Sequence, residues 1–88
     1  MNDFDMARLF KGLSHHRRVR ILKAVETKEG LTLSRIAELL ATTPSVAANH
    51  VRFLSDAGLI YKKRIGQRVM HGISPRGKKL LRLMLTLK

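Results

Sequence analysis

The sequence predicts a mainly α-helical fold with one small β-hairpin, which belongs to the α+β class. Apolar residues recur at helical spacing in several segments before residue 58. The pattern then changes to β-forming residues on both sides of a glycine-containing tip, Gly66-Gln67. After this tip, Ser74-Pro75 begins a leucine-rich stretch that continues to the end of the sequence. Because 88 residues suit one small domain, we expect residues 1–88 to form a single unit.

The first two helices are predicted from amphipathic spacing. A helix over residues 4–13 would share one face among Met6, Leu9, Phe10 and Leu13. A second helix is expected from His15 to about Thr27, with Ser14 as its N-cap and Gly30 just beyond its end. Its buried stripe includes the stem of one arginine and consists of Arg18, Ile21, Leu22 and Val25.

Two short helices joined by a turn are predicted next, after an apolar link or minimal strand at 31–33. The inward residues of the first of these helices are Leu33, Ile36, Ala37 and Leu40. In the turn, Thr43 is the expected N-cap and Pro44 occupies the first helical position. The second helix, residues 43–57, has as its inward residues Ala47, Val51 and Leu54. This pair of helices is a helix-turn-helix.

The hairpin is predicted from strands at 59–65 and 68–73, followed by a helix at about 75–88. The residues of this helix expected to face the core are Leu80, Leu83, Met84 and Leu87. Leu81 and Leu85 then need a second partner, and the simplest is the same helix of another copy. There are two alternatives for this helix: it packs on the core alone, or it is an amphipathic membrane helix. The order helix, helix, short strand, helix, helix, two strands, helix is that of a winged helix-turn-helix.

The charge of the chain indicates a polyanionic partner. The sequence has 18 Lys and Arg against 6 Asp and Glu, a net charge of +12. Residues 51–88 hold ten of the basic side chains and one acidic side chain, Asp56. Such an excess attracts phosphates and raises encounter rates with nucleic acid. We therefore expect the C-terminal half to face the phosphates of double-stranded DNA.

Several other classes of protein are not supported by the sequence. The absence of cysteine removes disulfides and thiolate metal sites. His15 and His16 point about 100° apart on a helix, so they make a poor metal site by themselves. No apolar run approaches the ~20 residues needed to span a bilayer, and the acidic N-terminus does not resemble a signal peptide. We expect no enzyme activity, no cofactor, no metal and no membrane partner, and a cytoplasmic, nucleoid-associated location.

Exposed residues of the helix at 43–57 are the candidate base-reading surface. Ser45, Ala48, Asn49 and Arg52 lie opposite its inward face, and small or hydrogen-bonding side chains suit entry into a DNA groove. Asn49 could pair with adenine, and Arg52 with guanine or a phosphate. The basic hairpin tip could contact phosphates. A second phosphate anchor could come from Arg17, Arg18 and Arg20, although Arg18 could instead pack its stem inward.

The chain resembles the arsenical-resistance-repressor (ArsR-type) family of winged-helix transcription regulators, and more loosely the MarR-type regulators. The resembling segments are residues 11–22, 31–60 and 61–73, with a MarR-like stretch at 73–81. The most specific piece for the fold is VRFLSDAGLI at 51–60. The resemblance implies a homodimeric repressor that binds an operator through two recognition helices, with wings on the adjacent backbone or minor groove.

The resemblance also implies which residues form each surface. The DNA-binding residues are then Thr43, Pro44, Ser45, Val46, Ala48, Asn49, Arg52, Lys63, Arg64, Gly66, Gln67 and Arg68. The expected dimer interface consists of Phe4, Leu81, Met84 and Leu85. The chain departs from the family at its metal ligands, because residues 31–36 contain no cysteine and residues 75–88 contain neither Asp nor His. An architectural DNA-coating protein and a protein-interaction module remain the alternative functions.

Overall fold

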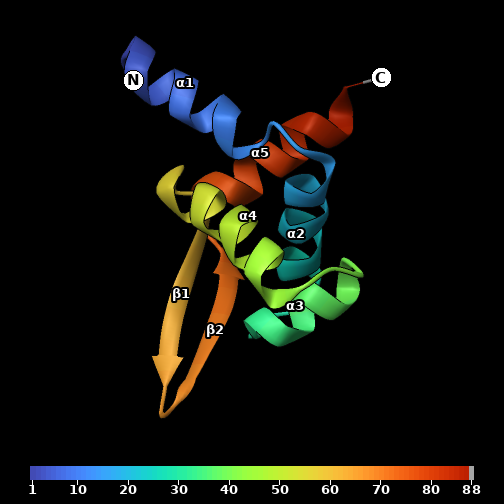
Figure 1. Cartoon of the computed structure of the whole chain (residues 1–88). Helices are drawn as coiled ribbons and strands as arrows, with labels where there is room; N and C mark the ends of the chain where they lie inside the picture. Colours follow the sequence, from blue (N-terminus) through green and yellow to red (C-terminus); the bar gives the residue numbers. More distant parts are fainter. Residues whose placement is uncertain (88) are drawn as a thin grey trace.

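The computed structural model describes residues 1–87 and has five helices and one two-stranded antiparallel sheet (Figure 1). The elements are α1 (Asp3–Gly12), α2 (His16–Thr27), α3 (Leu33–Leu39), α4 (Pro44–Asp56), β1 (Ile60–Ile65), β2 (Arg68–Ile73) and α5 (Pro75–Thr86). The predicted fold class and element order are confirmed. The minimal strand expected at 31–33 is a single β-bridge between Leu31 and His71.

The hydrophobic core is centred on α2, which is surrounded by α3, α4, α5 and β2. Helix α2 packs against α4, α5 and β2, and α3 packs against α4. Ile21, Leu22 and Val25 on α2 are completely buried, as the apolar stripe predicted. Residues from α3 and α4 that complete this core are Ile36, Ala37, Ala47, Val51 and Leu54. One continuous core therefore holds the helix-turn-helix against α2.

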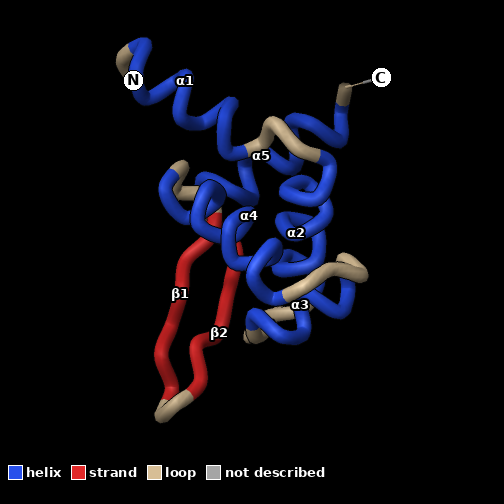
Figure 2. Tube along the Cα trace, viewed as in Figure 1, coloured by secondary structure: helices blue, strands red, loops and turns tan. Residues whose placement is uncertain are grey.

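The hairpin projects from the helical body, and its tip lies at the opposite end of the molecule from both chain termini (Figures 1 and 2). Its strands pair from Ile60 with Ile73 to Ile65 with Arg68. Only the base of the hairpin is buried, since β1 is exposed from its second residue onward. Gly66 closes the tip at φ 62°, a backbone conformation that favours glycine. The tip is therefore free to meet a partner.

Helix α5 is positioned by a close approach of Gly77 to the backbone. A Cβ atom at Gly77 would overlap the carbonyl group of Leu59. Ser74 also caps α5, because its Oγ accepts from the Gly77 N–H at 3.0 Å. These contacts turn one face of α5 toward the core. That face carries Gly77 and, three and four positions later, Leu80 and Leu81.

This orientation corrects the prediction for the last helix. Leu81 is 1% exposed and belongs to the core, so its expected need for an outside partner is wrong. Leu83 and Leu87, expected inward, are 60% and 76% exposed. Leu85 is 60% exposed, so it faces outward as expected, and its contact with a second copy stays a prediction. Leu80 and Met84 are partly buried against the core, also as expected.

Two details near the N-terminus also differ from expectation. The N-cap of α2 is His15, whose Nδ1 accepts from the Arg17 N–H at 3.0 Å, so the prediction of Ser14 is wrong. The Ser14 hydroxyl instead donates to the Lys11 carbonyl oxygen. On α1, Leu9 packs against the core, whereas Phe10 is 69% exposed. Within residues 1–87, no helix is both long and apolar enough to cross a bilayer.

Candidate nucleic-acid interface

The turn between α3 and α4 orients the candidate recognition helix. Ala41 takes a positive φ of 53°, and the Thr42 N–H donates to the Ala37 carbonyl oxygen at 3.0 Å. Thr43 Oγ1 then accepts from the Val46 N–H at 3.2 Å, and Pro44 follows at the start of α4. The predicted cap and proline position are both confirmed, so local chemistry fixes where α4 begins.

Helix α4 has one buried and one exposed face. Ala47, Val51 and Leu54 are buried, as predicted, and His50 is buried with them. The predicted base-reading positions are all exposed: Ser45, Val46, Ala48, Asn49 and Arg52. The acidic residue of α4, Asp56, is also exposed and lies four positions after Arg52, at the C-terminal end of this face, and it forms no ion pair within the described chain.

The two strongest candidate base readers are hydrogen-bonded to each other. Arg52 Nη2 donates to Asn49 Oδ1 at 3.0 Å, across one turn of α4. The guanidinium carbon of Arg52 also lies 5.3 Å from the centre of the Phe53 ring. These contacts hold two long polar side chains on one face of the helix, which lowers the entropic cost of using both on DNA.

The hairpin carries basic side chains on both of its faces. Cross-strand neighbours share a face, so Lys62 and Arg64 lie on one side of the sheet, and Lys63 and Arg68 on the other. All four side chains are exposed. Within residues 1–87 the one ion pair joins Arg35 and Glu38, so no acidic side chain neutralises the hairpin. A strand of phosphates could therefore lie against either face.

A buried polar contact beneath α4 was not anticipated from the sequence. Arg18 on α2 is 8% exposed, and its Nε donates to His50 Nδ1 at 3.1 Å. Its other guanidinium contacts are to the Lys11 carbonyl oxygen, to Ser14 Oγ and to the ring face of Phe53. Arg18 is thus committed to the core, and the prediction that it could anchor a phosphate is wrong.

The burial of Arg18 and His50 could have been anticipated from the two apolar stripes, but the contact between them could not. Arg18 occupies a stripe position of α2, and His50 lies beside the inward residues Ala47 and Val51 of α4. Buried polar side chains need hydrogen-bond partners, and here the two residues are hydrogen-bonded to each other. The spacing of the two residues predicts that both are buried, but it does not predict that α2 packs against α4.

Burial and positive neighbours make His50 hard to protonate. Desolvation is the main cause that lowers its pKa, and the positive fields of His15, Arg18, Arg17 and His16 act in the same direction. Burial likewise lowers the pKa of His71, partly offset by its bond to the Leu31 carbonyl oxygen. Among residues 1–87, no three His, Asp or Glu side chains are placed to hold a metal ion.

The expected dimer residues lie at the end of the molecule away from the hairpin tip. Phe4 on α1 is 70% exposed and Leu85 on α5 is 60% exposed. Met84 is partly buried, whereas Leu81 is in the core and is removed from this surface. Other large apolar side chains exposed on these two helices are Met6, Phe10 and Leu83, and Leu87 directly after α5 is exposed as well.

Comparison with known proteins identifies the fold and the family. A family model described as "Helix-turn-helix domain" matches residues 13–61, more than half of the chain. The solution structure of the homodimeric winged helix-turn-helix DNA-binding domain Mb0332 from Mycobacterium bovis, a possible ArsR-family transcriptional regulator, superposes with a TM-score of 0.85. It is 24% identical and covers 97% of this chain and 84% of that one.

Two curated transcription regulators are also similar. The cadmium resistance transcriptional regulatory protein CadC homolog of Staphylococcus aureus is 26% identical over 72 residues, which are 82% of this chain and 60% of that protein. The regulator YgaV of Escherichia coli (strain K12) is 28% identical over 67 residues, 76% of this chain and 68% of that protein. Both relatives are named as regulators of transcription, the class that the sequence predicted. The chain belongs to the helix-turn-helix domain family of DNA-binding regulators and has the winged fold of its ArsR-type members.

Proposed function

We propose that this protein is a homodimeric, sequence-specific regulator of transcription that reads double-stranded DNA with α4 in the major groove. The observation that carries the proposal is the exposed face of α4, which presents Ser45, Ala48, Asn49 and Arg52 together at helical spacing. Asn49 reads adenine through its amide, and Arg52 reads guanine or a phosphate. The turn residues Thr43 and Pro44, with Val46, lie against the DNA backbone beside them.

The hairpin acts as the wing. Basic side chains on both faces allow it to enter the minor groove, or to lie along the backbone, without presenting a neutral side. The residues in contact are Lys63, Arg64, Gly66, Gln67 and Arg68. Gly66 and Gln67 form the narrow tip, and nothing lies within 4 Å of a Cβ atom built at Gly66. Phosphate contacts of this kind give affinity and a strong salt dependence, while α4 gives sequence preference.

A second copy of the chain covers the exposed apolar side chains of α1 and α5. Phe4, Phe10 and Leu85 are each at least 60% exposed. They belong to α1 and α5, the two helices at the end of the molecule away from the hairpin tip (Figure 1). Isolated exposed leucines are ordinary, but a group of large apolar side chains at one end of a small domain supports an interface. The similar Mb0332 domain is homodimeric. Two wings would then extend from opposite ends of the dimer.

Repression, by occupancy of the promoter, is the proposed outcome of operator binding. A net charge of +12 favours one second candidate, an architectural protein that coats DNA with little sequence preference. The two functions differ in the ratio of operator binding to random binding, which is about 10³ or more for a regulator.

The test is a fluorescence-anisotropy titration on the DNA upstream of the protein's own gene and on a scrambled duplex, at two salt concentrations. Preference for the native fragment that persists at higher salt supports the regulator. Equal binding that collapses in salt supports the architectural protein. Failure to bind either duplex contradicts both and leaves the leucines of α5 as a surface for another protein.

A further inference from the structure

We propose that the groove between α2 and α3 binds a medium-chain carboxylate, a function beyond DNA binding. Two adjoining cavities form this α2–α3 groove. One, of about 190 Å³, is lined by Arg20, Ile21, Ala24, Ile36, Leu39 and Leu40. The other, of about 320 Å³, continues past Lys23 and Thr27 to Lys28 and Leu31. Ala24 and Leu39 line both cavities, so the two form one continuous groove.

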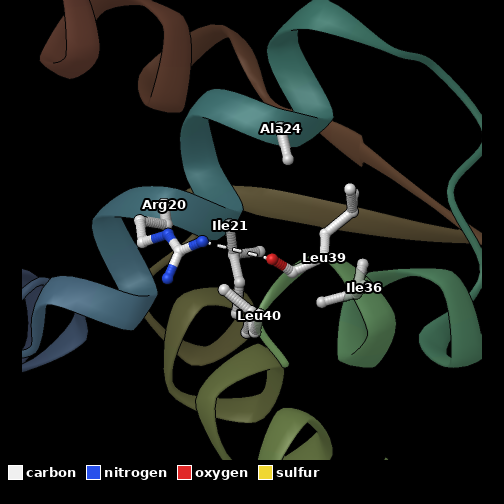
Figure 3. Close-up of a pocket in the computed structure, with 6 residues that line it drawn as sticks. All are labelled: Arg20, Ile21, Ala24, Ile36, Leu39 and Leu40. Atoms are coloured by element: carbon white, nitrogen blue, oxygen red, sulfur yellow. Dashed lines mark hydrogen bonds between the residues drawn. The ribbon is translucent and has the colours of Figure 1, made fainter. Parts of the chain in front are cut away.

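The floor of the groove is apolar. Figure 3 shows Arg20, Ile21 and Ala24 on α2 facing Ile36 and Leu39 on α3 and Leu40 directly after it. Ile21 and Ile36 are almost completely buried, whereas Leu39 is 41% exposed and stands at the junction of the two cavities. The small side chain of Ala24 leaves the space between the helices open. An alkyl chain laid here would cover the apolar surface of Leu39 that water now contacts.

The rim of the groove is cationic and unneutralised. Arg20 Nη2 donates to the Leu39 carbonyl oxygen at 3.2 Å, and no other hydrogen bond of the Arg20 side chain is found within residues 1–87 (Figure 3). Neither Arg20, Lys23 nor Lys28 takes part in an ion pair within the described chain. Arg20 therefore keeps guanidinium donors free to bind a carboxylate at the edge of an apolar surface.

The shape of the groove selects the ligand. Arg20 on α2 lies eight positions before Lys28, the residue that directly follows this helix. At the rise of a helix this separation is ~12 Å, the length of an extended chain of about ten carbons. An inorganic phosphate would use only the rim, and a neutral alcohol only the floor. A monocarboxylate of this length uses both, with its head at Arg20 and its tail over Ala24 and Leu39.

A second apolar groove, on the outer face of α5, is a weaker candidate. It is lined by Pro75, Lys78, Lys79, Arg82, Leu83 and Thr86. Its floor is the side of α5 that carries the exposed Leu83, and it lacks the fully buried isoleucines found between α2 and α3. We assign the neighbouring surface of α5 to the second copy of the chain.

The test is a titration of the full chain with decanoate, below its micelle concentration, followed by methyl NMR and calorimetry. We expect a Kd of about 0.1–1 mM, typical of a ligand with so few atoms in an open groove. The methyl signals of Ile21, Ile36 and Leu39 should shift. Because the free protein is titrated, failure of this test does not bear on DNA binding, and failure to bind DNA does not bear on it.

Matched variants decide the outcome. Arg20→Gln should weaken decanoate binding about fivefold or more, while Arg64→Gln, which removes the same charge from the wing, should leave it unchanged. Ala24→Leu should fill the groove and abolish binding. The proposal would be overturned if both charge variants weakened binding equally, or if decanol bound as strongly as decanoate. It would also be overturned if only the leucines of α5 shifted, or if decanoate did not bind at all.

Discussion

Arg18 Nε donates a hydrogen bond of 3.1 Å to His50 Nδ1 and so ties α2 to the buried face of the candidate recognition helix α4. An arginine side chain can only donate, so His50 Nδ1 must keep its lone pair and the neutral ring carries its proton on Nε2. Protonation of Nδ1 would remove the acceptor and place two positive charges together. The bond therefore exists only with neutral His50.

The first prediction concerns stability at low pH. The pKa of His50 is lowered in the folded chain, chiefly by burial, so the unfolded state binds more protons below its ordinary pKa of about 6.5. The free energy of unfolding should be fully retained above that pH and should decrease as the pH falls toward the lower folded pKa. His71 acts in the same direction. One such group contributes at most about 1.4 kcal/mol per pH unit.

Urea unfolding of the protein and of His50→Gln between about pH 8 and pH 5 measures this effect. Glutamine can still accept from Arg18 but does not titrate, so its stability should depend less on pH. The two proteins should differ by no more than about 1 kcal/mol at pH 8. Equal slopes in both proteins would show that His50 is not the group responsible.

The second prediction concerns the packing of α5 against Leu59. Gly77→Ala should destabilise the protein by about 3 kcal/mol or more, because the added Cβ overlaps the Leu59 carbonyl group and also lies 2.8 Å from Ile73 Cγ1. Thermal unfolding followed by circular dichroism measures the loss. Lys79→Ala, at an exposed position of the same helix, is the control and should change stability by no more than about 0.5 kcal/mol. A Gly77→Ala protein as stable as this control would contradict the close approach.

Elements set by local chemistry were predictable from the sequence. Thr43-Pro44 specifies the start of α4 and Ser74-Pro75 that of α5, because a cap and a proline act within one turn. The hairpin followed from Gly66-Gln67 between β-forming residues. The exposure of Asn49 and Arg52 followed from helical periodicity alone, while their roles on DNA stay predictions.

Features set by tertiary contacts were not predictable. Residues 80–87 contain so many apolar side chains that periodicity cannot select one face, and the Gly77–Leu59 contact selects it. This is why Leu81 and Leu83 were assigned to the wrong sides. Arg18 and His50 are 32 positions apart, and only the packing of α2 on α4 brings them together. The same packing withdrew Arg18 from the candidate DNA-binding surface.

The third prediction concerns the wing. Arg68→Ala should weaken binding to all duplexes by a similar factor and lower the slope of log K against log salt by about 1, because one phosphate contact is lost. Anisotropy titrations at several salt concentrations measure the slope. Lys79→Ala removes the same charge outside the wing and should leave the slope unaltered. An unchanged slope for Arg68→Ala would remove this residue from the phosphate contacts.

The fourth prediction concerns base reading. Asn49→Ala should reduce the preference for the operator over a scrambled duplex by about tenfold, as one bidentate base contact is worth about 1–3 kcal/mol. The variant also breaks the 3.0 Å bond to Arg52. Titration of Arg52→Ala and of the double variant completes a double-mutant cycle. This cycle separates the contribution of Asn49 to base reading from that of its hydrogen bond to Arg52. If the preference survives in Asn49→Ala, its base-reading role is wrong.

The fifth prediction concerns the dimer. Leu85→Glu should convert the protein to a monomer, because a carboxylate would be buried among the exposed apolar side chains of α5 and α1 in the assembly. Sedimentation equilibrium measures the mass. Ile65→Glu is a matched control, since Ile65 is 56% exposed but lies on the wing, and it should remain a dimer.

The folded domain itself should tolerate Leu85→Glu, since the side chain is 60% exposed in the single chain. Its circular dichroism should match that of the unmodified protein, which separates loss of assembly from loss of fold. Binding to a full operator should fall steeply, whereas a half-site should be bound about as well as before, because the α4 surface is intact. A Leu85→Glu protein that remains dimeric would exclude Leu85 from the interface and leave the exposed phenylalanines of α1 as the remaining part to test.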